Sequence, residues 1–149
     1  FEDVLKGYIS GYEQYFYTGR AFPAIKDVRG KIILFSRYSH NTIGIDATPW
    51  NDNDVFTITG KNIRIQDNYK VSDIDDKWDN VHDMLTDAKD NNPGYLYLNF
   101  CSGTADFPSS VYRPQDVANT ILGKLLPYIA RKKANRYGII PMDYPSDYH

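Results

Sequence analysis

The chain has 149 residues, of which 42% are hydrophobic and 24% are charged. This composition is typical of a globular protein and provides enough chain for one domain with a hydrophobic core. The formal net charge of −2 excludes the strongly basic surface of most nucleic-acid-binding proteins, and no apolar run approaches the roughly 20 residues that cross a bilayer.

The first patterned segment, residues 1–16, is predicted to be an amphipathic helix. No capping residue precedes its apolar stripe, and the sequence does not begin with methionine. We therefore expect a processed N-terminus, or a chain that begins within an element. The apolar residues that recur with the helical period are Phe1, Val4, Leu5, Tyr8, Ile9 and Tyr12.

Four segments read as strands. Residues 30–39 are apolar on both faces in their middle, as in a strand covered on both sides. The second segment alternates apolar and polar residues, and Pro141 makes the fourth less regular. In order, the segments are GKIILFSRYS (30–39), NIRIQDNYKV (62–71), YLYLNFCS (95–102) and RYGIIPMDY (136–144).

Two further helices are predicted over residues 72–94 and 113–134. Ser72 is a plausible N-cap of the first, and Pro114 occupies a favoured early position in the second, which Pro127 should kink. Strands recur every 32 to 42 residues with helices between them, which indicates βα units of a parallel sheet. Four parallel strands form either a small open α/β sheet or about half of a (β/α)₈ barrel.

Each predicted strand carries polar residues at its carboxyl end, where parallel α/β folds place their active sites. An arginine, a carboxylate and a tyrosine together suit a polyhydroxy ligand that carries a phosphate. The residues in question are Arg37 on the first strand, Asp67 and Tyr69 on the second, Asn99, Cys101 and Ser102 on the third, and Asp143 and Tyr144 on the fourth.

Structural interpretations remain open for the same residues. Arg37 and Asp67 could form an ion pair between neighbouring strands, and the two tyrosines could serve packing. Cys101, the single cysteine, is interpreted as a core residue. The acidic residues near position 52 are typical of a solvated turn. None of the three histidines (His40, His82 and His149) lies in a catalytic motif, and no phosphate loop or metal-binding spacing is present.

Five runs of sequence occur in the order found in a known family. They are DVRGKIILFSRYS, WNDNDVFT, IQDNYKV, LYLNFCSGT and RYGIIPMDY. The chain resembles the second half of the bacterial-type phosphatidylinositol-specific phospholipases C, within the superfamily of phospholipase-C-like phosphodiesterases. The resemblance implies that residues 1–149 form the C-terminal half of an X-type catalytic barrel, a distorted TIM barrel, whose N-terminal half is absent.

The resemblance also implies a reaction. The family cleaves phosphatidylinositol to diacylglycerol and a cyclic inositol phosphate, with one histidine as base, a second as acid, and an arginine that stabilises the phosphoryl group. These groups belong to the first half of the barrel, so the chain alone is expected to be inactive. By the resemblance, Arg37, Asp67 and Tyr69 contact inositol, and Trp50 and Asp52 lie in a loop near the pocket. Asp143 would orient the base histidine, and Phe107 would insert at the membrane interface.

The implied protein uses no cofactor and no metal, acts outside the cell or at its surface, and contacts inositol phospholipid or inositol phosphate, a membrane surface and the missing half-barrel. One alternative is a non-catalytic module that binds inositol phosphates or a membrane surface. Another is a fragment without a function of its own. A metal-dependent glycerophosphodiesterase barrel would need a set of acidic and histidine ligands that this sequence does not display.

Overall fold

The structure is a computed structural model that describes residues 1–131 and 135–145. The chain divides into two compact units, Phe1–Trp50 (unit 1) and Asn51–His149 (unit 2). Each unit is described by itself.

Unit 1 contains little regular structure. Its helices are α1 (Glu2–Ile9) and two short 3₁₀ turns, η1 (Glu13–Tyr15) and η2 (Ile25–Asp27). Its strands are two residues long and pair in parallel, β1 (Phe16–Tyr17) with β2 (Ile32–Ile33) and β3 (Phe35–Ser36) with β4 (Ile45–Asp46).

Two predictions for unit 1 are wrong in extent. The helix ends at Ile9 rather than near residue 16, because Ser10 is extended and Gly11 adopts a positive φ of 84° that stops the helix. The predicted strand over residues 30–39 is broken into β2 and β3. Ile32 and Ile33 are 58% and 37% exposed, so this segment is not covered on both sides.

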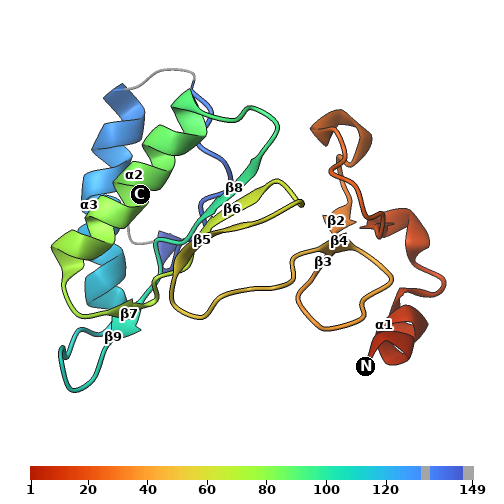
Figure 1. Ribbon diagram of the computed structural model, residues 1–149, viewed down its shortest axis with the longest axis horizontal. Coiled ribbons are helices and arrows are strands. Elements are labelled where there is room, and N and C mark those ends of the chain that lie inside the picture. The colour runs from red at the N-terminus through yellow and green to blue at the C-terminus, as the bar shows by residue number, and fades with distance from the viewer. Residues whose placement is uncertain (132–134, 146–149) are drawn as a thin grey trace. The chain divides into compact units, whose positions relative to one another are not determined.

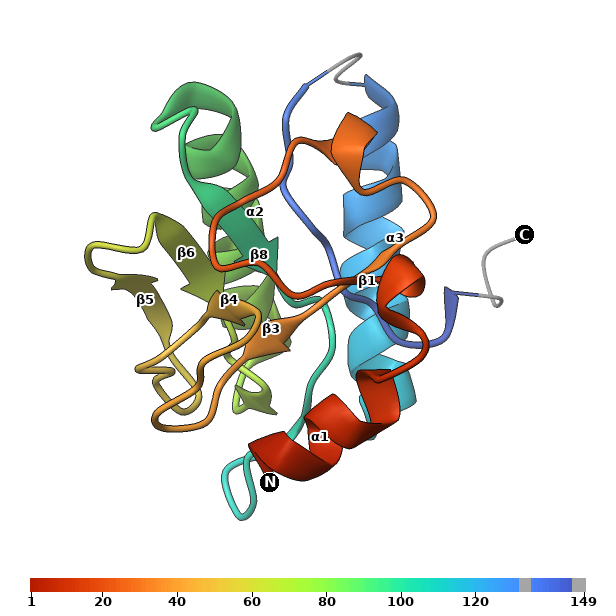
Figure 2. The same ribbon diagram turned by 90° about the vertical axis from the view of Figure 1, so that its right-hand side faces the viewer.

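Unit 2 is built on a three-stranded sheet with the order β5-β6-β8. The strands are β5 (Val55–Ile58), β6 (Ile63–Gln66) and β8 (Leu96–Asn99), which lie side by side in Figure 2. β6 and β8 run parallel, and their register places Gln66 opposite Asn99. This register brings the last residues of the two strands together.

The predicted strands over residues 62–71, 95–102 and 136–144 lie parallel where they pair, as β6, β8 and the bridge at Ile139. β5, which is antiparallel to β6, was not predicted from the sequence. The two strands form a hairpin whose turn contains Gly60 at φ 77° and Asn62 at φ 55°. Both residue types tolerate the left-handed conformation that such turns require. Beyond β6 the chain turns and enters β7 (Lys70–Val71), which pairs in parallel with β9 (Thr104–Ala105) as a separate small sheet.

Helices α2 (Ile74–Asp90) and α3 (Pro114–Arg131) confirm the two helices predicted in this region. The N-cap of α2 is Asp73 rather than Ser72, because the Asp73 carboxylate accepts a hydrogen bond of 2.7 Å from the N–H of Asp75. Pro114 opens α3 as predicted, and the helix continues through Pro127. Among the described residues, no helix is both long and apolar enough to span a bilayer.

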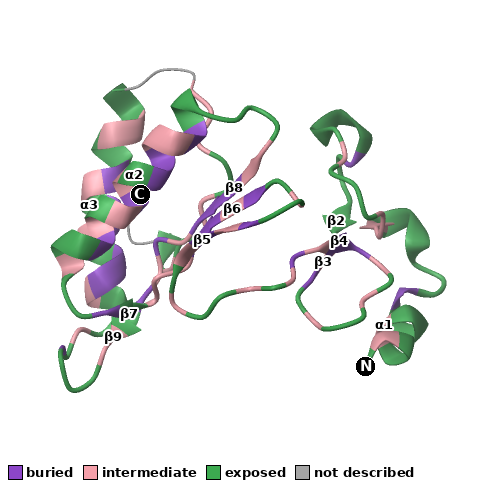
Figure 3. Ribbon diagram, in the orientation of Figure 1, coloured by how far each residue is buried: buried purple, intermediate pink, exposed green. Residues whose placement is uncertain are grey.

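The two helices pack against each other on one side of the sheet of unit 2 (Figure 1). Both helices carry buried residues, drawn purple in Figure 3, and most of these residues belong to two core clusters. The main core cluster consists of Val71, Val81, Leu85, Cys101, Val117, Ile121, Leu122 and Leu125, and a smaller one of Met84, Ala88 and Tyr97.

The last predicted strand is reduced to a single parallel bridge between Ile139 and Leu98. The carbonyls of Ile139 and Pro141 accept hydrogen bonds of 2.9 Å from Asn99 and Cys101, so the segment follows the edge of β8. Gly138 has a φ of 77°, and a Cβ there would lie 2.5 Å from the carbonyl oxygen of Tyr97. Only glycine fits this close approach, and the segment after it leads towards Asp143.

Candidate functional site

The segment after β6 carries two of the predicted ligand-binding residues. β6 ends at Gln66, so Asp67 and Tyr69 lie in a turn rather than on the apolar face of a longer strand. The N–H of Asp67 donates to the carbonyl of Asp54 (3.0 Å), and the N–H of Tyr69 donates to the carbonyl of Asp67 (3.0 Å). The first of these bonds connects the turn to the segment that precedes β5.

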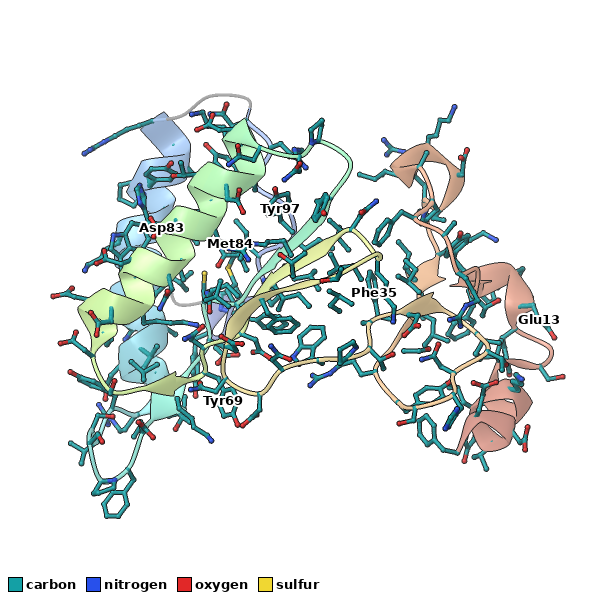
Figure 4. All side chains as sticks on the ribbon, viewed as in Figure 1. Glu13, Phe35, Tyr69, Asp83, Met84 and Tyr97 are labelled. Carbon is teal, nitrogen blue, oxygen red and sulfur yellow. The ribbon has the colours of Figure 1, made fainter. Side chains whose placement is uncertain are left out.

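Tyr69 lies in a polar cluster at the edge of unit 2 (Figure 4). Its hydroxyl donates a hydrogen bond of 2.9 Å to Asp52 Oδ1, and Lys70 Nζ lies 3.5 Å from Asp52 Oδ2. The bond to Asp52 raises the pKa of Tyr69, and the neighbouring Tyr69 and Asp52 raise the pKa of Lys70. Lys70 N–H donates to Asn53 Oδ1 (2.7 Å). The structure thus brings two predicted residues, Asp52 and Tyr69, into direct contact.

A buried polar network lies behind this turn. Gln66, Asn99 and Lys77 are only 0%, 0% and 3% exposed. Gln66 Nε2 donates to Asn99 Oδ1 (2.9 Å), and Lys77 Nζ donates to Gln66 Oε1 (3.0 Å) and to the carbonyl of Asn68 (2.7 Å). Asn99 Nδ2 donates to the carbonyl of Val81 (2.8 Å), which joins β6, β8 and α2.

The charge of Lys77 is unusual for such a position. Burial lowers the pKa of its ammonium to about 8, against smaller opposing effects of Cys101 and Asp67. Burial likewise raises the pKa of the Cys101 thiol to about 11, so Cys101 stays protonated at neutral pH. It packs in the core, which confirms its interpretation as a core residue.

A polar depression of about 230 Å³ adjoins the turn. The amide oxygen Oδ1 of Asn68 is buried there without a hydrogen-bond partner. A larger hollow of about 390 Å³ lies on α2 and α3 beside Trp78 and Tyr128, and no predicted site residue lines it. The residues around the polar depression are Asn53, Asn68, Lys70, Val71, Ser72, Asp73, Asp76, Lys77, Asn80 and Asp106.

Two predicted residues of unit 1 contact each other. The guanidinium carbon of Arg37 lies 4.0 Å from the centroid of the Trp50 ring, a cation–π geometry. Asp46 organises the segment before Trp50, because its Oδ1 accepts hydrogen bonds from the N–H (3.0 Å) and hydroxyl (2.7 Å) of Thr48. Arg37 and Asp67 lie in different units, so their predicted proximity stays a prediction.

Asp143 and Phe107 also lie in unit 2. Asp143 is half-buried and follows the segment that borders β8. Phe107 is 83% exposed in the loop between β9 and α3, as is Val111. Ser110 closes this loop, since its N–H donates to the carbonyl of Asp106 (3.0 Å) and its hydroxyl accepts from the N–H of Asp106 (2.9 Å).

The described histidines have different surroundings. His82 packs against Trp78 and Tyr128, with ring centroids 5.8 and 5.1 Å away. His40 is exposed in unit 1, and His149 lies outside the described residues. Among residues 1–131 and 135–145, no group of three or more His, Cys, Asp or Glu side chains could hold a metal ion.

The sequence is similar to two curated bacterial proteins. It is 32% identical over 159 aligned residues to the 1-phosphatidylinositol phosphodiesterases of Staphylococcus aureus strains Newman and NCTC 8325 / PS 47. The alignments include 97% of this chain but only 50% and 48% of those proteins, so the chain spans about half the length of these relatives. No family model matches the sequence.

Solved structures show the same relationship. A phosphatidylinositol-specific phospholipase C from Staphylococcus aureus superimposes with a TM-score of 0.75 at 30% identity, over 97% of this chain and 52% of the other. The corresponding phospholipase from Listeria monocytogenes gives a TM-score of 0.70 at 25% identity, over 95% and 52%. Over almost its whole length, the chain is therefore similar to about half of a bacterial phosphatidylinositol-specific phospholipase C.

Proposed function

We propose that this chain is the inositol-recognition part of a phosphatidylinositol-specific phospholipase C, corresponding to the C-terminal half of its (β/α) catalytic barrel. The similarity over 97% of the chain and half of the relatives supports this assignment. The observation that carries it is the turn after β6. There Asp67, Tyr69 and Asp52 place two carboxylates and a phenol hydroxyl beside the carboxyl end of β6.

The chemistry of these groups suits a phosphorylated polyol. The Asp67 carboxylate accepts hydrogen bonds from ring hydroxyls, the Tyr69 ring covers one face of the polyol, and the guanidinium of Arg37 binds anionic or hydroxyl oxygens. Trp50 and Asp52 hold Arg37 and Tyr69 through the contacts described above. These five residues form the proposed substrate-binding set.

In the whole enzyme, the inositol 2-hydroxyl attacks the phosphorus and the bond to the diacylglycerol oxygen breaks. The hydroxyl proton passes to a histidine base, and a second histidine protonates the leaving oxygen. Both histidines lie outside this chain in this proposal, and Asp143 orients the base. The products are diacylglycerol and a cyclic inositol phosphate.

The proposed partner of the loop between β9 and α3 is a membrane surface. The loop extends away from β9 (Figure 1), and its apolar side chain Phe107 is almost fully exposed. A related structure comes from work on membrane binding by the Staphylococcus aureus phospholipase. The proposal includes action outside the cell or at its surface, through a peripheral and transient membrane contact.

The test measures binding and turnover separately. We expect D-myo-inositol 1-phosphate to bind the 149-residue chain without turnover of phosphatidylinositol vesicles, and Arg37→Ala and Asp67→Asn each to weaken binding at least tenfold. Arg29→Ala is the matched control, because Arg29 is an exposed arginine of the same unit as Arg37. NMR titration reports binding, and release of soluble inositol phosphate reports turnover.

A second candidate is a non-catalytic module that binds inositol phosphates. Its supporting observation is that His82 packs in an aromatic cluster with Trp78 and Tyr128 on the two helices. A chimera distinguishes the two candidate functions. It fuses this chain to the half of a Staphylococcus aureus phosphodiesterase that the chain does not match. Turnover that Arg37→Ala abolishes supports the phospholipase, and a folded, ligand-binding chimera without turnover supports the module. Absence of inositol phosphate binding contradicts both.

A further inference from the structure

Lys77 is a buried cation in unit 2 that no proposed step uses. It is 3% exposed, and both acceptors of its ammonium, Gln66 Oε1 and the carbonyl of Asn68, are neutral groups. Within the described residues it forms no ion pair. Burying a charge without a directly paired carboxylate is unfavourable, so packing alone does not explain a lysine at this position.

The two acceptors flank the predicted ligand residue Asp67. Gln66 precedes it and Asn68 follows it, and the N–H of Asn68 also donates to Gln66 Oε1 (2.9 Å). One ammonium therefore closes the turn from both sides of Asp67. Tyr69 is the next residue, and its N–H donates to the carbonyl of Asp67.

The other side of this arrangement is fixed to the core. Gln66 Nε2 donates to Asn99 Oδ1 and to the carbonyl of Phe100, both at 2.9 Å. Asn99 is held in turn by the carbonyl of Val81 on α2, the helix that carries Lys77. The turn is thus connected to β6, β8 and α2 through side chains that are almost completely excluded from water.

We propose that Lys77 is a positioning residue, whose ammonium holds Gln66 and Asn68 so that Asp67 and Tyr69 are presented to the ligand in one conformation. The ligand part of this inference rests on the proposed function. The holding of the turn rests on the contacts of Lys77 alone, so the two parts can fail separately. A preorganised turn favours binding because the ligand does not have to order it.

The test compares Lys77→Met, which keeps the length of the side chain and removes the charge, with Lys89→Met on the exposed end of the same helix. We expect Lys77→Met to shift and broaden the amide signals of Asn68 and Tyr69, leave those of α3 in place, and weaken binding of D-myo-inositol 1-phosphate at least tenfold. Lys89→Met should change neither property, because Lys89 is exposed and its ammonium pairs with the exposed Asp90.

Each outcome decides one part. Unchanged turn signals in a folded Lys77→Met variant overturn the inference, and so does a disturbed turn that binds the ligand as tightly as the wild type. If the wild type binds no inositol phosphate, the proposed function fails while the turn signals still decide the role of Lys77. If Lys77→Met does not fold, the wild-type spectrum decides. Slowly exchanging Lys77 Nζ protons with NOEs to Gln66 and Asn68 support the inference, and fast exchange of these protons overturns it.

Discussion

At the scale of single residues, Lys77 makes the stability of unit 2 depend on pH. Burial lowers the pKa of its ammonium from 10.5 in the unfolded chain to about 8. Between these pH values the unfolded chain binds a proton that the folded chain does not, so folding becomes more favourable as pH rises. The full penalty of the buried charge applies below pH 8 and disappears near pH 10.5.

We therefore expect the wild type to gain about 1 kcal/mol of unfolding free energy, relative to Lys77→Met, between pH 7 and pH 9. Urea unfolding of both proteins at the two pH values measures this difference. The comparison cancels the effect of Cys101, whose raised pKa reduces stability above pH 9 in both proteins. An identical pH dependence in the two proteins would contradict the expectation.

The sequence predicted the exposed part of the candidate site better than its buried part. Asp67 and Tyr69 stood out because polar residues follow an apolar alternation, whereas Asp52 was assigned to the site only through the family resemblance. Gln66 and Lys77 did not, since alternation pairs Gln66 with Arg64, and Lys77 is an ordinary residue in the first turns of a helix. Gln66 and Asn99, each the last residue of its strand, were the available signal, but recognising it requires the register that places them opposite each other.

At the scale of elements, the structure places the N-cap of α2 one residue after the predicted position. Ser72 was the predicted N-cap, whereas Asp73 accepts the hydrogen bond from Asp75 N–H. We expect Asp73→Ala to reduce the unfolding free energy by about 1 kcal/mol, and Ser72→Ala to leave it within about 0.5 kcal/mol of the wild type.

Chemical denaturation of the two variants beside the wild type checks this expectation. A larger loss in Ser72→Ala than in Asp73→Ala would restore Ser72 as the cap. The two substitutions are matched, because both remove an exposed side chain next to the helix.

Helices and strands differed in how well the sequence defined them. α2 and α3 were predicted because the helical period is a local property of 17 and 18 residues. β5 was missed and the segment over residues 30–39 was overextended, because strand limits depend on partners that are distant in sequence. The last segment kept only the bridge at Ile139, where Pro141 lacks an N–H to continue a ladder.

At the scale of the whole molecule, the buried apolar residues are distributed unequally between the units. Unit 1, which is described in full, buries only Ile9, Val28, Ile45 and Ala47, and its strands are two residues long. Unit 2 contains both core clusters, the three-stranded sheet and the two long helices. The free energy of burial that offsets chain entropy therefore lies mainly in unit 2.

We expect residues 51–149, produced alone, to fold with a cooperative urea transition and a dispersed amide spectrum, because their core is internal to that segment. Residues 1–50 alone should give the narrow amide dispersion of an unfolded chain, since four buried apolar side chains cannot offset the entropy of ordering 50 residues. The 149-residue chain is the control for both. A non-cooperative transition in residues 51–149 would mean that the core of unit 2 needs the first 50 residues. In that case the polar turn carrying Asp67 and Tyr69 would be stable only in the intact chain.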